Sequence, residues 1–178
     1  MDEQTPEELE AHYGPSGPAA PALAWMEALQ RGDFEAAWRL TDPTFRLVIA
    51  QGWIWAHRER EDVGAYDRDE LAAALADPDL DHPLRAAFAE ALFSSVPTDE
   101  HWATGSRPRP LTPGYELVLL VPNVTEPFVI DEPTPLFAHG ILMHFTGSGW
   151  LVAGSGVVTP AVPGWPPIEG QAPPPIPS

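Results

Sequence analysis

Apolar residues recur at helical spacing through the first half of the chain, after a short acidic stretch. The pattern begins at Pro21 and predicts a helix that ends near Gly32, a residue type favoured just past the last helical turn. Its apolar face is formed by Ala22, Leu23, Met26 and Leu29. The folded part of the chain is therefore expected to open with a helix and a tight turn.

Further helices are marked by aspartates that precede an apolar stripe, because aspartate commonly caps a helix N-terminus. Pro43 strengthens one of these signals, since proline is well tolerated at the first helical position. The third helix is predicted to reach about His57, and an extra helical insert is predicted from Asp67 to Val96. The predicted N-caps are Asp33, Asp42, Asp67 and Asp81.

From Thr98 onward, proline and glycine separate short runs rich in β-branched and aromatic residues, a pattern typical of strands. The loop from Thr146 to Gly149 contains two glycines and has the length of a hairpin connection. The predicted strands are His101–Gly105, Tyr115–Val121, Phe128–Ile130, Leu136–Phe145 and Trp150–Ser155. Helices followed by hairpin-linked strands predict an α+β protein with an antiparallel sheet.

The order of these segments predicts one α+β domain over residues 21–159. Residues 1–20 combine carboxylates with glycine and proline, so they are predicted to form a flexible acidic leader. Residues 160–178 are too rich in proline for a helix or a central strand and are predicted to form an extended or disordered tail. Trp165 is the one residue of this tail expected to fold back onto the domain, because its ring gains from burial.

The formal net charge is −17, and the chain has no lysine. Phosphate backbones are bound through clustered basic residues, so nucleic acid is not expected to be a partner. No apolar run is long enough to cross a bilayer, and the acidic N-terminus lacks the basic and apolar regions of a secretory signal. The sequence therefore predicts a cytoplasmic protein with no membrane partner.

Motifs for familiar cofactors and nucleophiles are missing from the sequence. The chain has no cysteine, no HExxH motif, no glycine-rich phosphate loop and no nucleophile elbow. His139 and His144 are separated by an odd number of residues, which sends their side chains to opposite faces of a regular strand. Ser155 ends a predicted strand with no helix after it, so it is a poor candidate nucleophile. We therefore predict neither a metal nor a cofactor.

Two segments of the chain resemble the nuclear-transport-factor-2-like superfamily, the cone-shaped fold shared with ketosteroid isomerase and polyketide cyclases. The opening ALAWMEALQRGDFEAAWRLTDPTFRL is similar to its helix, Gly-Asp turn and second helix, and GILMHFTGSGWLVAG is similar to its closing hairpin. In element order the resemblance covers residues 21–156. It implies a curved antiparallel sheet with helices across its concave face, an apolar cavity, and a homodimer formed through the open sheet face. It does not imply an activity.

Five residues are predicted to line the pocket: Trp53, Tyr115, His139, Ile141 and Met143. His139 alternates with Ile141 and Met143 along an apolar strand face, so it is either a core histidine bonded to a backbone group or an acid or base that faces a ligand. Trp53 contacts either the core or a bound molecule. The Tyr115 hydroxyl either orients a ligand or is satisfied within the protein.

Three functions agree with these observations. The first is the binding of a small apolar molecule in the cone cavity, without catalysis. The second is an enzyme of the isomerase, cyclase or dehydratase kind that uses a histidine or carboxylate as general base. The third is an inhibitor-like interaction module whose acidic face meets a basic protein. The nature of the cavity discriminates between them, since an apolar pocket without titratable groups favours the first.

Overall fold

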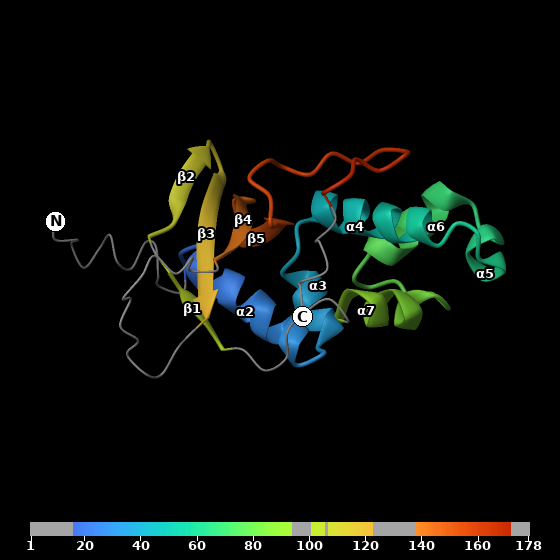
Figure 1. Cartoon of the computed structure of the whole chain (residues 1–178), viewed down its shortest axis with the longest axis horizontal. Coiled ribbons are helices and arrows are strands. Elements are labelled where there is room, and N and C mark those ends of the chain that lie inside the picture. Colours follow the sequence, from blue (N-terminus) through green and yellow to red (C-terminus); the bar gives the residue numbers. More distant parts are fainter. Residues whose placement is uncertain (1–15, 94–100, 106, 123–137, 172–178) are drawn as a thin grey trace, which may run out of the picture.

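The computed structural model of the chain describes residues 16–93, 101–105, 107–122 and 138–171, and these residues form an α+β protein (Figure 1). The helices are α2 (Ala19–Gln30), α3 (Phe34–Arg39), α4 (Pro43–Ala56), α5 (Glu61–Gly64), α6 (Arg68–Ala76) and α7 (Arg85–Phe93). The strands are β1 (Trp102–Thr104), β2 (Arg109–Thr112), β3 (Tyr115–Pro122), β4 (His139–Phe145) and β5 (Trp150–Ser155). The predicted order of helices followed by an antiparallel sheet is confirmed.

Three of the four predicted aspartate caps are confirmed by hydrogen bonds to the first helical turn. Asp33 accepts from the backbone N–H of Ala36 at 3.1 Å, and Asp42 accepts from that of Thr44 at 2.8 Å. Asp67 accepts from two backbone N–H groups at the start of α6. In each case the carboxylate satisfies donors that have no partner within the helix.

The fourth predicted cap, Asp81, is wrong. Helix α7 begins at Arg85, and Nδ1 of His82 accepts a hydrogen bond from the backbone N–H of Leu84 at 3.1 Å. Arg85 also donates to the backbone carbonyls of Asp77, Pro78 and Leu80, which draws the segment before α7 into a turn. The start of α7 is therefore set by contacts with an arginine that the helical pattern does not reveal.

The sheet has the strand order β1-β3-β4-β5, and β2 pairs with the same edge of β3 as β1 does. All of these pairs are antiparallel. The predicted hairpin of β4 and β5 is confirmed, with Phe145 opposite Trp150. The short strand β2 is not among the predicted strands, because Pro110 interrupts it and a proline lies on each side of it. The predicted strand Phe128–Ile130 and the first two residues of Leu136–Phe145 lie outside the described residues.

The helical half is joined to the sheet where the segment between α3 and α4 runs beside β5. Thr41 forms a parallel bridge with Val152. The N–H of Val152 donates to the carbonyl of Leu40 at 2.8 Å, and the N–H of Asp42 donates to the carbonyl of Val152 at 2.8 Å. These bonds occupy backbone groups at the edge of β5 that would otherwise lack partners.

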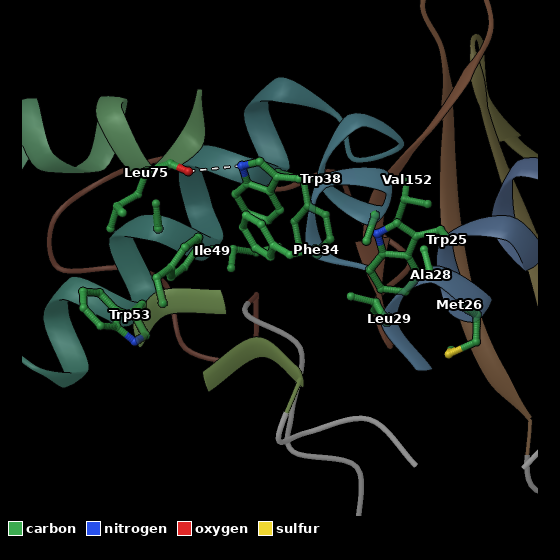
Figure 2. Packing of buried hydrophobic residues seen from close by; sticks show 14 of the residues in the cluster. Trp25, Met26, Ala28, Leu29, Phe34, Trp38, Ile49, Trp53, Leu75 and Val152 are labelled. Carbon is green, nitrogen blue, oxygen red and sulfur yellow. Dashed lines mark hydrogen bonds between the residues drawn. The ribbon is translucent and has the colours of Figure 1, made fainter. Parts of the chain in front are cut away.

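The core joins one face of the sheet to the helices. Helix α2 contacts β1, β3 and β5, while α4 contacts α6 and β5. Val118, Ile141 and Val152 contribute the sheet side of one continuous apolar cluster, and all three are fully buried. In the helical part of this cluster, Nε1 of Trp38 donates to the carbonyl of Leu75 at 3.1 Å, and Trp53 lies at the opposite end from Val152 (Figure 2).

Residues 157–171 contain no helix or strand and run from β5 across α4 and α6 (Figure 1). The backbone N–H of Gly164 donates to Oε1 of Gln51 at 2.9 Å. The indole of Trp165 donates to Oδ1 of Asp69 at 2.6 Å, and the guanidinium of Arg68 lies 5.1 Å from its ring centroid. This segment therefore contacts the helical layer through both its backbone and its tryptophan.

Candidate functional site

A cleft of about 550 Å³ lies between the start of α2 and the β4–β5 hairpin. Its two aromatic walls are Phe145, which is 45% exposed, and Trp150, and their ring centroids are 5.3 Å apart. None of the lining residues carries an ionisable side chain. They are Ser16, Gly17, Ala20, Pro21, Ala24, Phe145, Gly147, Ser148, Gly149 and Trp150.

Small residues on both elements leave the space that forms this cleft. Ala20 and Ala24 are one helical turn apart on α2, so they present a shallow strip to the hairpin. On the other side, Gly147 has φ +85°, a left-handed conformation that tightens the loop. The hydroxyl of Thr146 donates to the carbonyl of Gly149 at 3.1 Å and fixes the shape of that loop. The cleft therefore has a strip of small residues from α2 on one side and the adjacent rings of Phe145 and Trp150 on the other.

A second cleft of about 350 Å³ lies at the turn between β2 and β3 and shares Trp150 with the first. Its lining residues are Pro110, Leu111, Thr112, Pro113, Gly114, Tyr115, Glu116 and Trp150. Within the described ranges, the buried Oε2 of Glu116 has no hydrogen-bond partner. This cleft therefore differs from the first, because a carboxylate lies in its wall.

Tyr115 is the one predicted pocket residue that lines either of these two clefts. It is half-buried, and its ring is stacked on the imidazole of His144 with centroids 4.4 Å apart. Burial, and then the negative charge of Asp42, raise the pKa of the Tyr115 phenol above its ordinary value. The phenol therefore stays protonated at neutral pH and is able to donate a hydrogen bond.

The other predicted residues lie in the core. Ile141 and Met143 are fully buried on the face of β4 that meets the helices. His139 is also buried, and its Nε2 lies 2.8 Å from the hydroxyl oxygen of Ser155. Burial lowers the pKa of the His139 imidazole. The partner of this histidine is thus a side-chain hydroxyl on β5, where the sequence suggested either a backbone group or a ligand.

Trp53 lies on α4, and its ring contacts residues of the helical half of the protein. Its ring makes an edge contact with Phe88 at 5.7 Å between centroids and a tilted contact with His57 at 4.7 Å. The guanidinium of Arg60 lies 5.8 Å from the same ring. Within the described residues, no hydrogen bond or ring contact joins Trp53 to Tyr115 or His139, so the five predicted residues do not form one site.

A polar cluster that the sequence did not reveal lies where the α3–α4 junction meets the sheet. Nδ1 of His144 is 2.9 Å from Oδ2 of Asp42, and the two residues are 102 positions apart in the chain. The Asp42 side chain is 8% exposed and that of His144 is 30% exposed. From the sequence, Asp42 is predicted only to cap a helix, and His144 is considered only as a metal ligand beside His139 and rejected in that role. No local pattern could have joined them.

Comparisons of the chain with protein-family models, with curated proteins and with solved structures found no match. Within the described residues, no group of three or more histidines and carboxylates is arranged to hold a metal ion. None of the helices in those same ranges has the length and apolar character needed to cross a bilayer. What the fold and the sites define is an α+β protein with an uncharged aromatic cleft on one side of its final hairpin.

Proposed function

We propose that this protein binds a small, uncharged, predominantly apolar molecule in the cleft between α2 and the β4–β5 hairpin. The observation that supports this most is the composition of the cleft. Ten residues line it, and none is charged in a chain whose net charge is −17. Ligand sites in proteins are typically concave and mostly apolar, with a few polar groups that fix orientation.

The walls of the cleft suit a flat or aliphatic ligand. Phe145 and Trp150 offer two aromatic faces, which gain free energy when a ligand removes them from water. The hydroxyls of Ser16 and Ser148 are the side-chain polar groups of the lining. Because the Thr146 hydroxyl donates to Gly149, the Ser148 hydroxyl donates to Thr146 and is left to accept a hydrogen bond from a ligand. An anionic ligand is disfavoured, because the lining offers no cation and the surrounding protein is acidic.

The resemblance to the nuclear-transport-factor-2-like superfamily adds a second line of support. The resemblance implies an apolar cavity that is lined in part by the final hairpin, and the proposed cleft lies at the corresponding hairpin of this chain. A cone-like curvature of the sheet, a homodimer through its open face and a cytoplasmic location are part of the same proposal. Binding in the cleft requires none of these three.

The proposal is tested with N-phenyl-1-naphthylamine, an uncharged dye whose fluorescence rises in apolar surroundings. We expect saturable binding to the full chain. Phe145→Ala removes one aromatic wall and is expected to weaken the affinity about tenfold, while Ala24→Trp fills the cleft and is expected to abolish binding. Leu80→Ala is the matched control, because Leu80 is a 47% exposed apolar residue outside the cleft. Equal dye binding by the wild type and Ala24→Trp, with both proteins folded, would overturn the proposal.

A further inference from the structure

The Asp42 carboxylate fixes the protonation pattern of the His144 ring. Its Oδ1 accepts from the backbone N–H of Thr44 at 2.8 Å, and its Oδ2 faces Nδ1 of His144 at 2.9 Å. An ionised carboxylate only accepts hydrogen bonds, so Nδ1 must carry the proton in this contact. In the neutral imidazole, Nε2 then holds the free lone pair.

The plane of the ring is fixed as well. The Tyr115 ring lies against it with an interplanar angle of 5°, and the two residues are direct partners in the β3–β4 register. Within the described residues, no hydrogen bond is made to Nε2. The side chain is 30% exposed, and a Cβ atom built on Gly114 would lie 3.9 Å from Cδ2 of the imidazole. The His144 ring is therefore firmly oriented and partly exposed, and it lies next to Gly114, which has no side chain.

The Asp42–His144 contact, the stacked ring and the Nε2 atom without a hydrogen bond together favour a role in proton transfer over a purely structural role. A buried carboxylate that bonds to Nδ1–H fixes both the tautomer and the orientation of the ring, as in the carboxylate–histidine pairs that transfer protons. A structural ion pair would not require the opposite nitrogen to lack a hydrogen bond within the described residues. The Asp42 carboxylate lies at the N-terminus of α4, where the helix dipole interacts favourably with a negative charge.

We propose that His144 is a general base, positioned by Asp42 and Tyr115, for a small uncharged molecule that carries a C–H bond acidified by a neighbouring electron-withdrawing group. Nε2 takes the proton, and the electron pair of the C–H bond stays with the substrate. The positive charge of the resulting imidazolium is then compensated by the negative charge of the Asp42 carboxylate. The proton returns to another atom of the substrate or to its leaving group, so no oxidant or other reactant is needed. The negative charge of Asp42 disfavours anionic substrates at the same place.

The probe is 5-nitrobenzisoxazole, a flat uncharged molecule that opens when a base removes its C–H proton. The C–H electron pair forms the nitrile, the N–O bond breaks and opens the ring, and the resulting cyano-nitrophenolate is measured by its absorbance. We expect the full-length protein to accelerate this reaction and His144→Gln to lower the second-order rate constant at least tenfold. The matched control is His57→Gln, because Nδ1 of His57 bonds to the backbone carbonyl of Trp53 and not to a carboxylate. This control is expected to retain the wild-type rate.

Asp42→Asn tests the positioning role. Asparagine keeps an oxygen for the N–H of Thr44, but its amide group can donate to Nδ1 and so favour the opposite tautomer. We expect a rate loss of about tenfold. In ¹⁵N NMR spectra the proton of His144 is expected on Nδ1 in the wild type and on Nε2 in the variant. A merely structural contact would not move the rate and the tautomer together.

Two results would overturn the inference without relying on the stability of any variant. The first is a wild-type NMR spectrum in which the neutral His144 ring carries its proton on Nε2. The second is a wild-type rate no greater than that of free imidazole at the same concentration. Where His144→Gln unfolds, His144→Gly with added imidazole replaces it, and a failure of imidazole to restore the rate in folded protein contradicts the proposal. The dye experiment on the α2–hairpin cleft is independent of all these outcomes.

Discussion

The indole nitrogen of Trp165 lies 2.6 Å from Oδ1 of Asp69, which links the C-terminal segment to the first turn of α6. The Trp165 ring is half-buried, and the guanidinium of Arg68 lies over it. The neighbouring Gly164 bonds to Gln51 of α4. One tryptophan and one glycine therefore hold a proline-rich segment across two helices.

Trp165→Ala is expected to destabilise the protein by about 1–2 kcal/mol, because a half-buried aromatic ring and a charge-assisted hydrogen bond are lost together. Trp165→Phe keeps most of the ring and removes only the N–H donor, so it is expected to cost about 1 kcal/mol or less. Thermal or urea unfolding measures both changes. Deletion of residues 172–178 is the control and is expected to leave the free energy of unfolding unchanged. A fully stable Trp165→Ala protein would show that this contact does not stabilise the fold.

Thr41 is the centre of a buried hydrogen-bond chain beside β5. Its hydroxyl accepts from Nε1 of Trp25 at 2.9 Å and donates to the carbonyl of Ala37 at 2.8 Å. Thr41→Val preserves the shape of the residue and leaves the buried indole N–H without an acceptor, which is expected to cost about 1–3 kcal/mol. Thr41→Ser keeps the hydroxyl and is expected to cost less than half as much. Equal losses for the two variants in urea unfolding would mean that packing, and not the hydrogen bonds, dominates at this position.

Local signals in the sequence predicted local structure well. Asp33, Asp42 and Asp67 each cap the helix that follows, since a cap depends on residues only two or three positions away. The hairpin of β4 and β5 was predicted for the same reason. The start of α7 was missed because Arg85 bonds to carbonyls up to eight residues before it. Hydrogen bonds from a side chain to backbone carbonyls do not depend on which residues supply the carbonyls, so no residue pattern in the sequence predicts them.

The candidate sites were less predictable than the fold. The alternation along β4 correctly grouped His139 with Ile141 and Met143, but it could not show that Ser155 of another strand supplies the histidine's partner. The pairing of β4 with β5 shifts register between Leu142 and Met143, so even a correct hairpin would not have predicted this partner reliably. Clefts depend on how several elements meet, which explains why Tyr115 alone among the predicted residues lines either of the two clefts described above.

The buried pair of His139 and Ser155 gives a double-variant prediction. His139→Phe removes the imidazole and leaves the Ser155 hydroxyl buried without its partner, which is expected to cost about 1–3 kcal/mol. Adding Ser155→Ala removes the stranded hydroxyl, so the double variant is expected to regain part of that loss. Urea unfolding of the two single variants and the double variant measures the coupling. Strictly additive effects would contradict an energetic link between the two side chains.

The charge of the protein predicts its behaviour toward nucleic acid. With a net charge of −17 and nine arginines as its only basic residues besides histidine, the chain is expected to show no affinity for duplex DNA or RNA at physiological salt. A gel-shift experiment at micromolar protein concentration tests this. A shifted band that weakens as salt is added would contradict it, because such a dependence reports phosphate contacts by basic groups.

The lowered pKa of the buried His139 imidazole predicts that the free energy of unfolding depends on pH. Burial lowers the pKa of its imidazole in the folded state, whereas the unfolded chain has the ordinary value of about 6.5. Below pH 6.5 the unfolded state therefore binds more protons than the folded state, so stability falls as the pH is lowered from about 6.5 towards the folded pKa. Above pH 6.5 this group contributes no slope.

The double variant His139→Phe/Ser155→Ala isolates this contribution, because every other titratable group is common to both proteins. We expect the melting temperature of the wild type to fall more steeply than that of the double variant between pH 6.5 and pH 5. The difference is limited to about 1.4 kcal/mol for each pH unit, the free energy of one proton over that interval. Calorimetry at several pH values gives both curves. Parallel curves over this range would mean that the folded protein accommodates the charged imidazole as easily as water does, and His139 would then not be a neutral core histidine.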